Sequence, residues 1–70
     1  MTLKHAELEK EYKIKNITTR DEELNAFLFS LGCYAGENIT AITRLKGGLI
    51  VAIKNARYSI DNLLADAIEI

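Results

Sequence analysis

The stretch NITAITRLKGGLIVAIKN, residues 38–55, decides the fold of this chain. Its two halves are rich in Ile, Val, Leu and Thr, and residues of this kind favour extended strands. The sequence Lys46-Gly47-Gly48 separates the halves, and its glycines can supply the positive φ angles that a tight turn requires. The pattern therefore predicts a β-hairpin with strands over Asn38–Leu45 and Leu49–Asn55.

Upstream of the hairpin, residues 19–31 carry a helical pattern. Thr19 followed three residues later by Glu22 is typical of a capping box at a helix start. Apolar side chains then recur at the spacing of a single helix face, at Leu24, Phe27, Leu28 and Leu31. Gly32 follows directly and favours a left-handed stop. The sequence predicts one helix over Thr19–Leu31.

The remaining segments are short and mostly extended. Alternation of apolar and lysine side chains predicts a strand over Tyr12–Ile17, with Lys13 and Lys15 in solvent. Near the N-terminus, Leu3, Ala6 and Leu8 are expected to cover part of the core. After the hairpin we expect a turn at Asn55-Ala56-Arg57 and then a strand at Tyr58–Ile60. One helical turn over Leu63–Ala65, capped by Asp61 or Asn62, precedes a last strand at Ala67–Ile70. Five short strands with one inserted helix predict a single all-β domain over residues 1–70, a small SH3-like barrel.

Composition narrows the classes of protein to which the chain can belong. Nine Lys and Arg against ten Asp and Glu give a net charge of −1, which disfavours a strongly basic nucleic-acid binder. A single cysteine excludes an internal disulfide framework and every multi-cysteine zinc pattern. The chain opens with no secretory leader, and no apolar run approaches about 18 residues, so we expect a soluble cytoplasmic protein.

No pattern in the sequence assembles a catalytic site, and we expect no enzymatic activity, no cofactor and no bound metal. His5 is the only histidine, and it can share a metal with Glu9 only if that segment is helical. The acids at 21–23 are explained by the positive end of the helix dipole. Cys33 has no histidine or second cysteine near it in sequence, which favours a small buried hydrophobe over a nucleophile or metal ligand.

The segment LFSLGCYAGE, residues 28–37, is more specific. A helix that ends in Leu-x-x-Leu-Gly, followed by an apolar residue and then a glycine three positions on, resembles the FeoA family (ferrous iron transport protein A). The stretches Arg57–Ile60 and Ala65–Ile70 resemble that family's last two strands. The chain departs from the family pattern at Glu9-Lys10-Glu11, where a Pro-Gly turn is common, at Phe27 in place of a basic residue, and at Ala35 in place of a proline.

The resemblance implies a small cytosolic SH3-like protein, without enzymatic activity, that binds FeoB, a membrane ferrous iron transporter with a cytosolic GTP-binding domain. Such a protein would reach the inner membrane only through this partner, would neither insert into the membrane nor bind nucleic acid, and is compatible with a weak homo-oligomer. The alternative is a metal-responsive regulatory domain that binds a divalent transition metal directly through His5, Cys33 and nearby acids. A small-barrel nucleic-acid binder is a weaker alternative, because it needs a clustered basic and aromatic face.

Phe29 lies off the apolar stripe of the helix, directly before the turn at residues 32–36. An exposed aromatic side chain beside an apolar turn forms a patch of the kind that anchors protein interfaces. The predicted partner-binding residues are Phe29, Leu31, Gly32, Cys33, Tyr34 and Gly36. In the other interpretation Phe29 and Tyr34 only close the end of the barrel. A separate candidate surface consists of Lys13, Lys15, Lys54 and Arg57. These residues either form a basic outer face for an acidic partner or are simply the solvated face of a strand.

Overall fold

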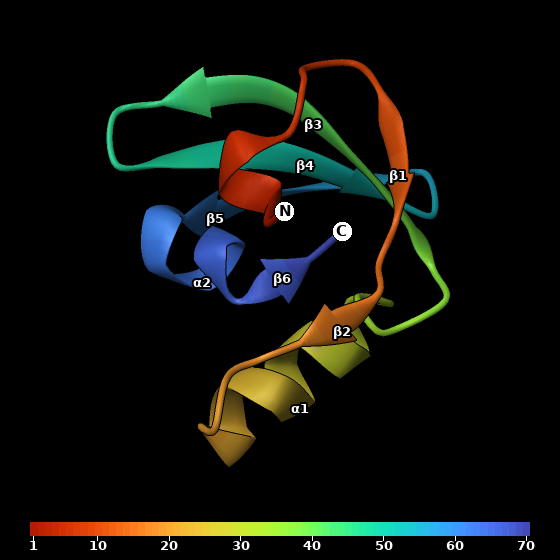
Figure 1. Ribbon diagram of the computed structural model, residues 1–70, viewed down its shortest axis with the longest axis vertical. Helices are drawn as coiled ribbons and strands as arrows, with labels where there is room; N and C mark the ends of the chain where they lie inside the picture. The colour runs from red at the N-terminus through yellow and green to blue at the C-terminus, as the bar shows by residue number, and fades with distance from the viewer.

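The computed structural model describes all 70 residues, and antiparallel strands form most of its regular structure. One sheet has the order β1-β3-β4-β5, with β1 at Glu11–Lys13, β3 at Asn38–Leu45, β4 at Gly48–Ile53 and β5 at Ala56–Asp61. A second sheet pairs β2 at Asn16–Ile17 with β6 at Ile68–Glu69. The remaining elements are the helices α1 at Glu22–Ser30 and α2 at Asn62–Asp66 and the 3₁₀ turn η1 at Leu3–His5 (Figure 1).

The elements wrap around one interior. In Figure 1 the hairpin β3–β4 crosses the upper part of the molecule and η1 overlaps it in the view, while α2 and β6 lie beneath it and α1 lies below β2. The two chain ends are neighbours, because the N–H of Ile70 donates to the carbonyl of Met1 at 2.8 Å and Thr2 bridges to Glu69. The arrangement confirms the predicted mainly β fold.

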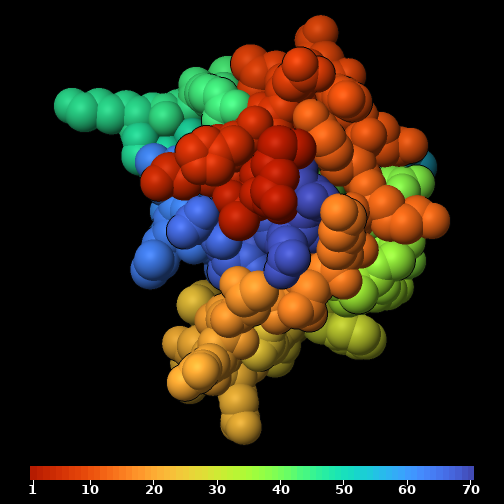
Figure 2. Space-filling model, in the orientation of Figure 1, coloured from red at the N-terminus to blue at the C-terminus, as the bar shows by residue number.

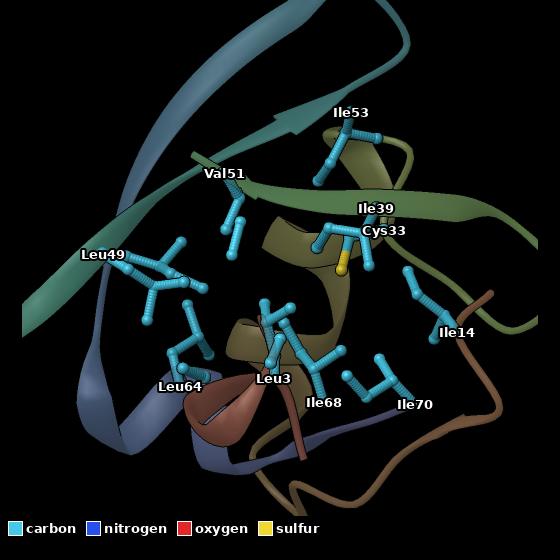
Figure 3. Packing of buried hydrophobic residues seen from close by; sticks show 14 of the residues in the cluster. Leu3, Ile14, Cys33, Ile39, Leu49, Val51, Ile53, Leu64, Ile68 and Ile70 are labelled. Atoms are coloured by element: carbon cyan, nitrogen blue, oxygen red, sulfur yellow. The ribbon is translucent and has the colours of Figure 1, made fainter. Parts of the chain in front are cut away.

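Fifteen buried apolar side chains form one core, to which every part of the chain contributes (Figure 3). In β4, buried Leu49, Val51 and Ile53 alternate with half-buried residues, which is the period of two expected of a strand. The other members of the core are Leu3, Ala6, Ile14, Leu28, Cys33, Ile39, Ala41, Ile60, Leu64, Ala65, Ile68 and Ile70. Leu8, which was expected to cover this core, is 44% exposed.

The predicted β3–β4 hairpin is confirmed, but its two glycines act for different reasons. Gly47 has a φ of +86°, as a tight turn requires. Gly48 does not have a positive φ and opens β4. A Cβ at Gly48 would lie 3.0 Å from Cα of Asp61 and would collide with the carbonyl oxygen of Ile60. Gly48 is therefore required by the close approach of β5, and the prediction of positive φ angles at both glycines is wrong.

The second tight turn lies one residue earlier than predicted. Lys54 and Asn55 have φ angles of 48° and 69°, and two consecutive positive values are typical of a two-residue hairpin turn. Ala56 and Arg57, which were expected in the turn, already belong to β5. The short turn thereby makes β5 longer than the predicted strand at Tyr58–Ile60.

The expected strand over Tyr12–Ile17 divides into β1 and β2, which gives six strands instead of five. Ile14 lies between them, where its N–H donates to the carbonyl of Glu37 and its carbonyl accepts from the N–H of Gly36, both at 2.8 Å. These bonds lead the chain from one sheet to the other and place the Ile14 side chain in the core. Lys13 and Lys15 are exposed, as predicted.

The helix α1 is shorter than predicted and has a different cap. Asp21 accepts hydrogen bonds on Oδ1 from the N–H groups of Glu23 at 2.9 Å and Leu24 at 3.3 Å. Thr19 Oγ1 accepts instead from the N–H of Asp21 at 3.2 Å, so the predicted capping box of Thr19 and Glu22 is wrong. The chain is still extended at Asp21, with φ −81° and ψ 112°, and cannot begin the helix earlier.

Only part of the predicted apolar stripe on α1 reaches the interior. Leu28 is buried and Leu24 packs against the core, but Phe27 is 50% exposed. Leu28 is the one fully buried residue of this nine-residue helix, and the neighbouring side chain of Phe27 remains in solvent. The assignment of Phe27 to the core face is therefore wrong.

Two further contacts fasten the segments that cover the core. Arg44 donates from Nη1 to the carbonyl of Lys4 at 2.7 Å and from Nη2 to the carbonyl of Ala6, which ties the N-terminal segment to β3. Asp61 accepts from the N–H of Leu64 at 2.8 Å and caps α2, which confirms the predicted helical turn.

Candidate functional site

The candidate site lies where α1 ends and the chain reverses toward β3. The N–H groups of Gly32 and Cys33 donate to the carbonyls of Phe29 and Leu28 at 3.0 and 2.9 Å. Gly32 has a φ of +87°, which confirms the predicted left-handed stop. Because the chain turns back here, Tyr34 comes to lie next to Phe29 on the last turn of α1.

Phe29 and Tyr34 form an aromatic pair on the surface. Their ring centroids are 4.9 Å apart and the ring planes make an angle of 31°, within the range that favours contact between aromatic rings. Phe29 is 66% exposed and Tyr34 is half-buried. In the space-filling view, the start of α1 and the residues before it project from the lower end of the molecule (Figure 2).

Lys54 fixes the position of Tyr34 from the opposite side. Its Nζ donates to the hydroxyl of Tyr34 at 3.1 Å, lies 5.3 Å from the centre of the Tyr34 ring and pairs with Glu37 Oε1 at 3.4 Å. The hydrogen bond to Tyr34, and after it the charge of Glu37, raise the pKa of Lys54 above its usual value. The amine is therefore protonated at neutral pH and gives the aromatic pair a positively charged edge.

The lysine stem also explains why glycine stands at the end of α1. A Cβ on Gly32 would lie 3.2 Å from Cδ and 3.3 Å from Cε of Lys54. The stem thus crosses the backbone where a side chain would stand. The positive φ therefore favours glycine at position 32, and a side chain there would also have to displace the flexible stem of Lys54.

The six residues predicted to bind a partner do not form one continuous surface. Phe29 and Tyr34 are in contact, Leu31 is half-buried, and Gly36 is exposed with a φ of +95°. Gly32 and Cys33 are buried and shape the turn from beneath. Lys54 and Glu37 also belong to this site, which no pattern in the sequence indicated. Glu37 directly precedes β3 and Lys54 directly follows β4, so only the fold brings Lys54 to Tyr34 and Glu37.

Cys33 is part of the core and is chemically quiet. It is 1% exposed, its side chain points into the interior (Figure 3), and burial raises the pKa of its thiol to about 11. A thiol with this pKa is protonated at neutral pH, whereas nucleophiles and metal ligands need the thiolate. The interpretation of Cys33 as a packed hydrophobe is confirmed.

The residues named for a direct metal site are not gathered. His5 is exposed on η1, and Cys33 is enclosed by apolar side chains. No group of three or more His, Cys, Asp and Glu side chains stands close enough to hold one ion.

The predicted basic face is a face of mixed charge. A hollow of about 510 Å³ lies over the four-stranded sheet and contains Lys54 and Arg57, but also Glu11 and Glu37. Lys13 lies on β1 opposite Asn38, and Lys15 adjoins the second sheet through the bond from its N–H to the carbonyl of Glu69. The four basic residues therefore do not make a uniform site for an acidic partner. No helix of this structure has the length and hydropathy of a membrane span.

Comparison with known proteins gives a family and a fold. The family model described as the FeoA domain matches residues 1–70. No curated protein sequence matches the chain. Among solved structures, iron(II) transport protein A of Clostridium thermocellum superposes with a TM-score of 0.88 and 24% identity over 99% of this chain and 43% of that one.

Two other solved structures have the same fold at lower identity. FeoA of Stenotrophomonas maltophilia, determined with zinc and described as an SH3 domain protein, has a TM-score of 0.84 and 18% identity over 97% of this chain and 86% of that one. A manganese-dependent transcriptional repressor has a TM-score of 0.86 and 20% identity, and this chain covers only 39% of it. The shared architecture confirms the predicted SH3-like barrel.

Proposed function

Because the chain belongs to the FeoA domain family, we propose that it is a non-enzymatic accessory protein of ferrous iron transport that binds the cytosolic part of a FeoB-type GTPase-permease. The observation that carries the proposal is the exposed aromatic pair of Phe29 and Tyr34, supported on one side by Lys54. An ordered aromatic pair on the surface is suited to binding a partner rather than to bond-breaking chemistry.

The aromatic pair has the properties of an interface anchor. Rigid aromatic side chains contribute large contact areas at small conformational cost, and they are enriched among the residues that dominate binding energy. Tyr34 is already held by Lys54 and by Phe29, so little side-chain freedom is left to lose when a partner binds. Glu37 and Lys54 place one charge of each sign at the rim, which can fix the orientation of the partner.

The binding residues that we propose are Phe29, Leu31 and Tyr34 as direct contacts, with Gly32, Cys33 and Gly36 shaping the turn that presents them. Lys54 and Glu37 are added to this group from the structure. The protein acts in the cytoplasm, at the inner membrane only through its partner. Neither a cofactor nor a membrane segment of its own is required for this role.

The test measures binding to the purified cytosolic GTPase region of a FeoB-type permease from the same cell by isothermal titration calorimetry. The double variant Phe29→Ser/Tyr34→Ala should weaken binding at least about 30-fold, the effect of losing one strong aromatic anchor. The matched control is Phe27→Ser, because Phe27 is a similarly exposed aromatic two residues away that does not touch Tyr34. This control should bind like the parent chain.

Two results would contradict the proposal at different levels. If the parent chain binds and the double variant binds equally well, the surface lies elsewhere, and Lys13, Lys15 and Lys54 are the next residues to exchange. If the parent chain binds no FeoB-type region with or without guanine nucleotide, the proposed partner is wrong. A stoichiometric ferrous or manganous site, abolished in a His5→Ala/Cys33→Ala variant, would support the metal-responsive alternative instead.

A further inference from the structure

The strand β5 is an open edge of the four-stranded sheet. Its only neighbour in the sheet is β4, with pairs that run from Gly48 opposite Asp61 to Ile53 opposite Ala56. No residue of the second sheet pairs with it. One side of its backbone is therefore available to another strand.

Two features of the backbone decide which residues face outward. The two-residue turn at Lys54 and Asn55 makes Ile53 and Ala56 a hydrogen-bonded pair, as the residues next to such a turn are. Hydrogen-bonded and non-hydrogen-bonded pairs alternate along the two strands. Six residues after Ala56, the N–H of Asn62 donates to the carbonyl of Gly47 at 2.9 Å, as this alternation requires. The backbone groups of even-numbered residues thus point to β4.

The outward backbone groups belong to Arg57, Ser59 and Asp61. No turn, loop or cap hydrogen bond reaches the backbone of Arg57 or Ser59. Asp61 is the N-cap of α2, so its carbonyl accepts from the first turn of that helix and its N–H is the group that remains available. All three side chains are exposed. They share one face of the sheet, because they alternate with half-buried Tyr58 and buried Ile60.

The β5 edge has little of the usual protection against pairing. Natural sheet edges are guarded by short length, proline, charged side chains or a bulge. The two charged residues of β5, Arg57 and Asp61, are of opposite sign, so they do not repel a second copy of the same strand. The sequence ARYSID of β5 has no proline and no lysine, its register with β4 is unbroken over six pairs, and none of its residues has a positive φ. The opposite edge, β1, is only three residues long and follows Glu9, whose φ is +63°.

We propose that β5 pairs antiparallel with β5 of a second copy of this chain, about a two-fold axis through Ser59. In this register Arg57 lies opposite Asp61 of the second copy, Ser59 lies opposite Ser59, and Asp61 lies opposite Arg57. All three pairs join outward-facing residues. The Ser59 pair exchanges two backbone hydrogen bonds, and the N–H of each Asp61 donates to the carbonyl of the opposite Arg57, because the Asp61 carbonyl serves α2. The result is an eight-stranded sheet with two opposite-charge pairs.

Charge selects this register over its neighbours. An axis through Arg57 would set two arginines opposite each other, and an axis through Asp61 would set two aspartates opposite each other, both unfavourable. An axis at Tyr58 or Ile60 pairs fewer outward residues. Asp61 can take part while it caps α2, because the cap uses its Oδ1 and its carbonyl and leaves its N–H and Oδ2 available.

The contact is small, so the dimer should be weak. Stable interfaces bury about 1,600 Å² in total, more than a single six-residue edge provides, and we expect a dissociation constant between about 10 μM and 1 mM. The inference is independent of the proposed permease partner, because it concerns self-association of the purified chain alone.

The first experiment measures self-association of the full chain by sedimentation equilibrium over a concentration series. Arg57→Glu turns both cross-strand pairs repulsive and should weaken the dimer at least about tenfold. Lys13→Glu is the matched control, with the same change of charge on the opposite edge, and should leave the dimer unchanged. A mixture of Arg57→Glu with Asp61→Arg should restore the dimer, because every pair across the two copies is then of opposite charge.

The second experiment reads the register directly and does not need the Asp61 variant, which also loses the cap of α2. Ser59→Cys should form a disulfide-linked dimer on mild oxidation, because the Cα atoms at position 59 of the two copies would lie about 5.5 Å apart. Thr43→Cys, an exposed position on β3 away from the edge, should not. A parent chain that remains monomeric at about 1 mM, or equal crosslinking of both cysteine variants, would overturn the proposal.

Discussion

Replacing Gly48 by alanine tests the close packing of β4 and β5. The added Cβ would lie 3.0 Å from Cα of Asp61 and 3.1 Å from the carbonyl carbon of Ile60, and would collide with the oxygen of that carbonyl. All three atoms belong to backbone, so no flexible side chain can move aside. The two strands must separate by about 1 Å to restore ordinary contacts, which is more than a hydrogen bond tolerates.

The cost follows from what this separation breaks. The bond from the N–H of Asn62 to the carbonyl of Gly47 and its neighbour in the β4–β5 ladder would be weakened, at about 1 kcal/mol each. Overpacking adds about 1–3 kcal/mol. We expect Gly48→Ala to lower the free energy of unfolding by about 3–5 kcal/mol, out of a total of about 4–10 kcal/mol for a chain of this size.

The adjacent glycine provides the control. A Cβ at Gly47 meets no atom within 4 Å, so Gly47→Ala suffers only from its φ of +86° and should lose about 1–2 kcal/mol. Both variants are compared by far-UV circular dichroism in urea melts, with equal slopes required for a valid comparison. If Gly48→Ala is as stable as Gly47→Ala, or more stable, the argument from close approach is refuted.

Three further outcomes are expected. Leu28→Ala should cost about 2–5 kcal/mol because the side chain is buried, whereas Phe27→Ala should cost less than about 1 kcal/mol; similar losses in urea melts would contradict the placement of α1. Arg44→Met removes two hydrogen bonds to the N-terminal segment and should speed hydrogen exchange in residues 3–6 more than in β4; unchanged exchange there would show that the clamp is unimportant. Burial raises the pKa of Cys33 to about 11, so the folded chain holds the thiol proton more tightly than the unfolded chain; stability should fall as pH rises from about 9 to about 11, and Cys33→Ala should make that slope smaller.

Local sequence determined most of the elements of this protein. Alternation in β4, the glycine that ends α1 and the short helical turn near Asp61 are set by neighbouring residues, so the pattern predicts them. The Leu-x-x-Leu-Gly segment likewise indicated the family. The predictions were wrong at the ends of elements. Asp21 rather than Thr19 caps α1, because several adjacent residues can act as the N-cap and the path of the backbone determines which one does.

The tertiary structure alone decided how distant residues meet. Phe29 was recognised as off the apolar stripe, but its contact with Tyr34 and the support of Tyr34 by Lys54 depend on the turn after α1 and on the β4–β5 turn meeting in space. Gly48 was expected to have a positive φ, but glycine is needed there because the backbone of β5 passes close to it. Local preferences act over a few residues of chain, whereas these contacts depend on the packing of strands that are far apart in sequence. A local pattern of residues therefore does not predict which of these residues meet.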